Sequence, residues 1–217
     1  MNELSLVQRI VVWILPVVFA ITVHEVAHGW VAKKRGDKTA WMLGRLTLNP
    51  IKHIDPIGTI LIPGLLLISG TGFIFGWAKP VPVNMRNLKN PVKDMAIVAA
   101  AGPISNVLMA IGWALFGRIG AVLDIEAITE PMIYMSIAGI SINLVLALIN
   151  LLPIPPLDGS RILSALLPKK LAWQFGRIER YGFFILLFLL YTGALSSILG
   201  YPMYVAQKLF FSLAGLK

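Results

Sequence analysis

The chain has 217 residues, of which 57% are hydrophobic and only 13% are charged. This composition excludes an ordinary soluble domain, in which about 25% of residues are charged, and it predicts an integral membrane protein. The 19 Lys and Arg outnumber the 10 Asp and Glu, but the bases are spread over short loops, so we exclude nucleic acid and expect them to face anionic lipid. Because cysteine is absent, any metal ligands must be His and carboxylates.

The first apolar span covers about residues 8 to 32 and contains the sequence His24-Glu25-Val26-Ala27-His28. Two His four residues apart lie about 40° apart around a helix and about 6 Å along its axis, so both rings can bind one ion. Glu25 can take a proton from a water that the metal activates. The alternative is a set of polar residues that bond within the bundle, but three such groups in one turn are costly in lipid. We therefore predict a zinc site with Glu25 as the general base.

A dense basic loop follows this span and is cytoplasmic by the positive-inside rule, which leaves the N-terminus outside. The next apolar stretch, Ile54 to Trp77, holds seven Gly and Pro residues and has basic loops on both flanks. These features favour a re-entrant or broken segment, while a kinked crossing helix stays open as the alternative. Residues 78 to 83 alternate Pro with other residues and are predicted to be extended.

Three further spans are expected at about residues 95 to 116, 131 to 152 and 181 to 199. The loop with Asp124, Glu126 and Glu130 is acidic and is placed outside, whereas the loop after residue 152 is basic and cytoplasmic. Residues 202 to 217 are expected to form a short helix at the interface or beside the bundle. We predict an all-α polytopic membrane protein with about four to six membrane helices, which form one membrane-embedded domain over residues 1–217 of a multi-pass protein of the cytoplasmic (inner) membrane.

A catalytic zinc needs three protein ligands and one open position. Asp158 is the candidate for the third ligand, because it follows a proline-rich segment that ends a span, Asn150-Leu-Leu-Pro153-Ile-Pro155-Pro156-Leu157. Asp158 and His28 both lie near the cytoplasmic ends of their spans, so their depths match. The competing interpretation, a cap for a helix that starts at residue 160 or 161, is left open. His53 is interpreted as a loop or interfacial residue and not as a ligand.

Two amides complete the candidate site. Asn106 follows the small residues Ala101 and Gly102 early in a span, and Asn150 ends another span. Each amide could bond between helices or donate to a substrate carbonyl or oxyanion. We name both as candidate substrate-binding residues, with Asn150 the stronger of the two.

These motifs resemble the site-2 protease family of intramembrane zinc metalloproteases, in particular its compact bacterial and archaeal members. The resemblance rests on residues 24–28, 101–106 and 150–159, and it covers nearly the whole chain in order. It implies that His24, His28 and Asp158 bind one Zn²⁺, that Glu25 activates water, and that Asn150 helps to seat the substrate. It also implies a β-like element after the first helix, where residues 54 to 83 lie. Many relatives carry PDZ or CBS domains, and this sequence shows neither.

The predicted function is therefore regulated intramembrane proteolysis, in which a zinc metalloendopeptidase cleaves transmembrane protein substrates in contact with membrane lipids. Two alternatives belong to other classes: a metal-ion transporter and a catalytically silent membrane scaffold. A transporter would place ionisable groups along a path through several spans, whereas here they cluster at one depth. A membrane-anchored zincin that cleaves soluble peptides is a closer alternative. The sequence identifies neither the substrate nor the oligomeric state.

Overall fold

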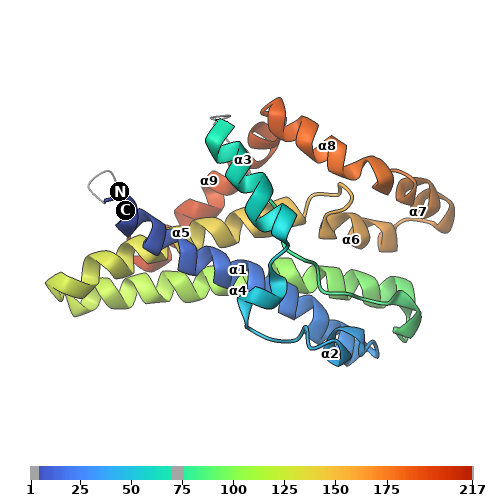
Figure 1. Ribbon diagram of the computed structural model, residues 1–217, viewed down its shortest axis with the longest axis horizontal. Helices are drawn as coiled ribbons and strands as arrows, with labels where there is room; N and C mark the ends of the chain where they lie inside the picture. The colour runs from blue at the N-terminus through green and yellow to red at the C-terminus, as the bar shows by residue number, and fades with distance from the viewer. Residues whose placement is uncertain (1–4, 70–75, 217) are drawn as a thin grey trace.

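The computed structural model describes residues 5–69 and 76–216, and every regular element assigned within those ranges is a helix (Figure 1). Three of these helices are long and apolar enough to cross a membrane, and a bent pair makes a fourth span if it is counted as one. The predicted all-α polytopic membrane fold is confirmed. The α-helices are α1 (Leu6–Arg35), α2 (Thr39–Met42), α3 (Ile62–Ser69), α4 (Pro91–Leu123), α5 (Glu126–Asn150), α6 (Asp158–Leu166), α7 (Lys169–Gly176), α8 (Glu179–Tyr191) and α9 (Ala194–Ala214).

Helices α1, α4 and α5 lie side by side and form the body of the molecule, with α4 in contact with both others (Figure 1). Glycines allow α4 and α5 to pack closely. A methyl group built at Gly117 would lie 2.3 Å from Ser136 Oγ, and one built at Gly139 would lie 2.3 Å from the Trp113 ring. Small residues at such contacts are typical of membrane helices, because lipid supplies no hydrophobic force between them.

The helix ends follow local sequence signals. Ser5 caps α1 in a reciprocal arrangement with Gln8, and Gly36 ends α1 at a φ of 115°, a conformation that favours glycine. Helices α4 and α5 extend further than predicted. The expected acidic outer loop is reduced to Asp124 and Ile125, because Glu126 already begins α5.

The stretch from Ile54 to Trp77 starts as a π-helical turn at Pro56–Leu61 and continues into α3. The chain then returns to its starting point, because Trp77 N–H donates to Gly58 O at 3.1 Å and Thr59 Oγ1 donates to Trp77 O at 2.8 Å. This return favours the re-entrant interpretation, and the depth of the segment in a membrane stays a prediction. The β-like form is not seen in the described part of this stretch, which carries no assigned strand.

The final span differs from the prediction of one helix over residues 181 to 199. It breaks after Thr192, and α8 and α9 meet at a bend of 76°. The cause is Gly193, whose φ of 74° cannot continue a right-handed helix. Helix α9 runs through Pro202 and packs its Phe210 and Ala214 into the core made by α4 and α5, which matches the predicted placement beside the bundle.

Candidate metal centre

His24 and His28 lie one turn apart on α1, and both are buried inside the bundle. Their rings meet edge to face, and the two Nε2 atoms are 3.0 Å apart. The four-residue spacing therefore brings both imidazoles to one point, as the helical period predicts.

Asp158 reaches the same point from a distant part of the chain. It is the first residue of α6, and its Oδ2 lies 3.3 Å from Nε2 of His24 and 3.3 Å from Nε2 of His28. The capping alternative is wrong, because Leu157 occupies the N-cap position and the Asp158 side chain faces the imidazoles. One ligand atom from each of the three residues lies within 4.8 Å of the others.

Two glycines hold the loop that carries Asp158 in place. A methyl group at Gly159 would lie 2.2 Å from Leu151 O, and one at Gly182 of α8 would lie 1.9 Å from Pro155 O. Only glycine therefore allows α6 to begin against the end of α5, and only glycine allows α8 to approach the loop so closely.

The ring nitrogens show whether these residues suit a metal. Nδ1 of His24 lies 2.6 Å from Asn106 Oδ1, and Nδ1 of His28 lies 2.7 Å from Val98 O. A carbonyl oxygen can only accept a hydrogen bond, so each Nδ1 carries the proton and each Nε2 presents a lone pair. Asp158 Oδ2 is buried and receives no hydrogen bond from the described residues. Two lone pairs and a carboxylate oxygen aimed at one point form a possible site for a cation.

The spacing of these atoms fits zinc. Bonds of about 2.0 to 2.1 Å in a tetrahedral arrangement place neighbouring ligand atoms about 3.3 Å apart. The separations of 3.0, 3.3 and 3.3 Å agree with that value. Three ligands also leave the fourth position that a catalytic zinc keeps open.

Gly102 of α4 forms the wall opposite the two imidazoles. A methyl group there would lie 2.4 Å from His28 Nε2 and 2.6 Å from His24 Nε2. A small residue early in a membrane span lets helices approach closely, which is one reason for a glycine here. The structure adds a second reason, because a side chain at this position would fill the space in front of both lone pairs.

Glu25 lies next to His24 and is held by the backbone of residues 78–83, which carry no helix and are called the extended segment below. Its Oε2 accepts a hydrogen bond of 2.7 Å from Val81 N–H. The segment passes directly over α1 at Gly29, where a methyl group would lie 2.8 Å from Val81 Cγ1. Lys79 anchors the same segment, because its N–H donates to His53 O at 2.9 Å and its O accepts from Arg45 at 2.9 Å.

The two predicted substrate-binding amides lie in different surroundings. Asn106 is completely buried. Its Oδ1 accepts from His24 Nδ1, and its Nδ2 donates to Asn143 Oδ1 at 2.9 Å. Asn150 ends α5, is half-buried and donates to Leu146 O at 2.9 Å. A substrate contact stays a prediction for both. Sequence reasoning missed Asn143, although an amide in the middle of an apolar span is itself a signal.

His53 stands apart from this group. It ends a 3-10 turn at Pro50–His53, its ring is buried, and Nε2 donates to Thr47 O at 2.9 Å.

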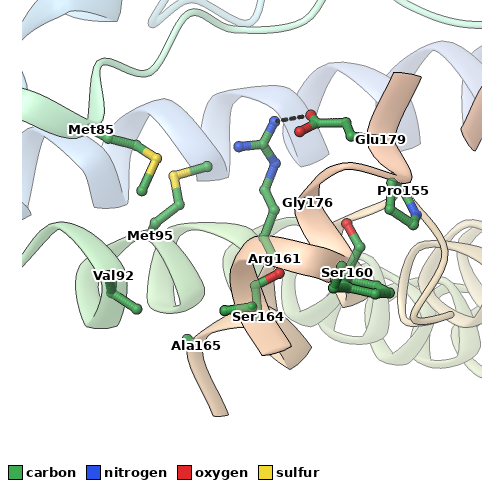
Figure 2. A pocket seen from close by; sticks show the side chains of 12 residues that line it. Met85, Val92, Met95, Pro155, Ser160, Arg161, Ser164, Ala165, Gly176 and Glu179 are labelled. Atoms are coloured by element: carbon green, nitrogen blue, oxygen red, sulfur yellow. Dashed lines mark ion pairs between the residues drawn. The ribbon is translucent and has the colours of Figure 1, made fainter. Parts of the chain in front are cut away.

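A cavity of about 230 Å³ lies beside the Asp158 segment, between the start of α4 and helices α6, α7 and α8 (Figure 2). Pro155 and Ser160, which flank Asp158, form part of its wall. An ion pair of 3.9 Å between Arg161 and Glu179 crosses it, and both side chains are exposed. The cavity therefore combines an apolar lining with an exposed ion pair, and Asp158 itself is not one of its lining residues.

Comparison with known proteins agrees with the geometry. The model for "Peptidase family M50" matches residues 116–191, which include Asp158. Two similar proteins carry the name "Putative zinc metalloprotease": YwhC of Bacillus subtilis, 43% identical over 90% of this chain and 86% of that protein, and Rip2 of Mycolicibacterium smegmatis, 31% identical over 82% and 65%. No solved structure matches the chain at a significant level. The chain therefore belongs to peptidase family M50, the site-2 protease family that its motifs resemble, and it is a membrane metalloprotease.

Proposed function

We propose that this chain is a single membrane-embedded domain that uses one zinc ion to hydrolyse peptide bonds of transmembrane substrates. The observation that carries the proposal is the meeting of His24, His28 and Asp158 at one buried point, with Glu25 beside the first ligand. The names of YwhC and Rip2 support zinc as the metal.

Each residue at the centre has a distinct role in this proposal. The imidazoles of His24 and His28 and the carboxylate of Asp158 hold the zinc, which supplies Lewis-acid polarisation when it is bound. Glu25 takes the proton of the attacking water and returns it to the leaving amine. Val81 N–H restrains the Glu25 carboxylate during this transfer. Asn150 is proposed to contact the substrate near the scissile bond.

A transmembrane helix hides its peptide bonds, so a substrate must unwind before cleavage. The extended segment offers an edge to which the unwound chain can add as a strand. The backbone groups of Trp77 and Lys79 form hydrogen bonds with other parts of the protein, so this edge of the segment is occupied. Because Pro80 and Pro82 lack N–H groups, the opposite edge offers few donors, and the Pro80 carbonyl on it already accepts from Arg45 at 3.4 Å. Substrates that unwind easily, with Gly, Pro or Asn near the cytoplasmic leaflet, should be favoured.

We place the active site near the cytoplasmic side of the inner membrane, with the N-terminus outside. The Lys and Arg residues at the end of α1 and after α6 support this orientation by the positive-inside rule, and some of them lie over aromatic rings, as is typical of a membrane interface. Lys33 lies 4.5 Å from the centre of the Trp41 ring, and Arg177 lies 5.1 Å from that of Trp173. Since the chain has no native cysteine, single cysteines at positions 38 and 124 can be labelled from either side of a sealed vesicle.

The test uses purified protein in proteoliposomes with a transmembrane peptide and a soluble peptide of the same cleavage sequence. The parent should cleave the transmembrane peptide. Glu25→Gln should bind the same amount of zinc as the parent but should not cleave the peptide. Cleavage of the soluble peptide alone would show a membrane-anchored zincin instead. Full activity of Glu25→Gln would refute the assignment of the base, and zinc flux into the vesicles would support a transporter.

A further inference from the structure

A line of buried amides connects α5 to the proposed metal centre. Asn143 has no exposed surface, and its Nδ2 donates to Gly139 O at 2.8 Å within its own helix. Its Oδ1 accepts from Asn106 Nδ2 at 2.9 Å, and Asn106 Oδ1 in turn faces His24 Nδ1 at 2.6 Å. Asn106 Nδ2 also donates to Ala20 O of α1, at the longer distance of 3.4 Å. Helices α5, α4 and α1 each contribute one side chain.

This line has only one consistent direction. Gly139 O cannot donate, so Asn143 must present its NH₂ group to it and its oxygen to Asn106. The oxygen of Asn143 then requires the NH₂ group of Asn106, which leaves the Asn106 oxygen facing His24. Nδ1 of His24 must therefore carry the proton, and Nε2 keeps the lone pair that a metal needs.

We propose that Asn143 is a positioning residue for the metal centre, which sets the tautomer of His24 by fixing the orientation of the Asn106 amide. The proposal rests on the proposed zinc site. Without Asn143, only the 3.4 Å hydrogen bond to Ala20 O still favours this orientation, so a fraction of the Asn106 amides can turn over and present the NH₂ group to His24. The imidazole would then carry its proton on Nε2, where it cannot bind a metal.

A comparison with His28 explains why the Asn106 amide needs a partner such as Asn143. Nδ1 of His28 faces Val98 O, a backbone carbonyl that can only accept. The tautomer of His28 is therefore fixed by the backbone of α4, which cannot turn over. An amide side chain at the other imidazole can face either way, so it needs a partner that determines its orientation.

The experiment compares Asn143→Leu, which removes the acceptor, with Asn143→Asp, whose carboxyl group keeps an acceptor for the Asn106 NH₂ group whether or not it is protonated. Asn143→Ala serves as a second removal without added bulk. The matched control is Ser136→Ala on the same helix, because Ser136 is equally buried and bonds to Trp113 O, away from the imidazoles.

Two measurements are made on each purified variant. The first is ¹⁵N NMR of the metal-free protein at a pH where the imidazoles are neutral, which is practical because the chain has only three His. The parent, Asn143→Asp and Ser136→Ala should show His24 protonated at Nδ1, whereas Asn143→Leu and Asn143→Ala should show an Nε2–H population. The second is the zinc dissociation constant by chelator competition, which should rise about 10- to 100-fold in the two removal variants only, the range seen for residues that orient metal ligands.

The results separate this inference from the proposed function. An unchanged His24 tautomer in both removal variants overturns the role of Asn143. Equal weakening of zinc binding by Ser136→Ala overturns it as well, because the effect would then be general loosening of the helix contact. If the parent protein binds no zinc at all, the proposed function fails, while the NMR comparison still decides the tautomer.

Discussion

Replacing Gly102 with Ala tests the geometry of the centre, because the added methyl group enters the space that the metal needs. The methyl would lie 2.4 Å from His28 Nε2 and 2.6 Å from His24 Nε2, about 0.8 to 1.0 Å inside the 3.4 Å at which ordinary contact begins. Overpacking of this kind costs about 1 to 3 kcal/mol if the helices shift to relieve it. If all of this free energy weakens metal binding, the zinc dissociation constant rises about 5- to 150-fold.

The assay is a chelator-competition titration of zinc on purified protein, together with thermal unfolding of the metal-free protein. Gly112→Ala is the matched control, since Gly112 lies on the same helix and a methyl group there meets no atom within 4 Å. We expect zinc binding in the control to equal that of the parent. If Gly102→Ala bound zinc as tightly as Gly112→Ala, the proposed place of the metal in front of the two imidazoles would be wrong.

The other predictions concern the surroundings of the site. Gly29→Ala should push Val81 away from α1 and break its bond to Glu25, so peptidase activity should fall at least tenfold while zinc content stays unchanged; loss of zinc would contradict this. Burial raises the pKa of Asp37, but hydrogen bonds from Thr39, Asn87 and Asn84 together lower the pKa by more than burial raises it. The pKa of Asp37 therefore lies below its ordinary value. The stabilisation by Asp37 is therefore complete above the unfolded-state pKa of about 3.9 and is lost as pH falls through the lower folded-state value. The difference in melting temperature between the parent and Asp37→Asn should be constant from pH 7 to 5 and shrink below about pH 4; a difference that already shrinks between pH 7 and 5 would refute this assignment.

Much of the site was predictable because its residues lie in short sequence motifs whose local structure is well defined. The spacing of His24 and His28 determines that their side chains share a helix face, and the prolines before Asp158 indicate the end of a span. Matching depths then placed the carboxylate near the imidazoles, and the structure brings the three together at 3.0 to 3.3 Å.

The parts that were missed depend on contacts between distant elements. The hydrogen bond from Val81 to Glu25 uses a backbone N–H, which no residue type reveals. The break at Gly193 was missed because hydropathy continues across it, and only the left-handed φ of that glycine turns α9 back onto the bundle. Asn143 was visible as an amide in an apolar span, but its partner Asn106 could be identified only once the helices were placed together.

The proposed function depends on one zinc ion that is held jointly by α1 and α6. An anomalous difference map at the zinc absorption edge, from crystals of the zinc-loaded protein, can locate this ion. We expect one peak per chain, about 2.0 to 2.2 Å from Nε2 of His24, Nε2 of His28 and a carboxylate oxygen of Asp158. A peak that lacks Asp158 as a neighbour, or no peak between the two imidazoles, would rule out the proposed centre.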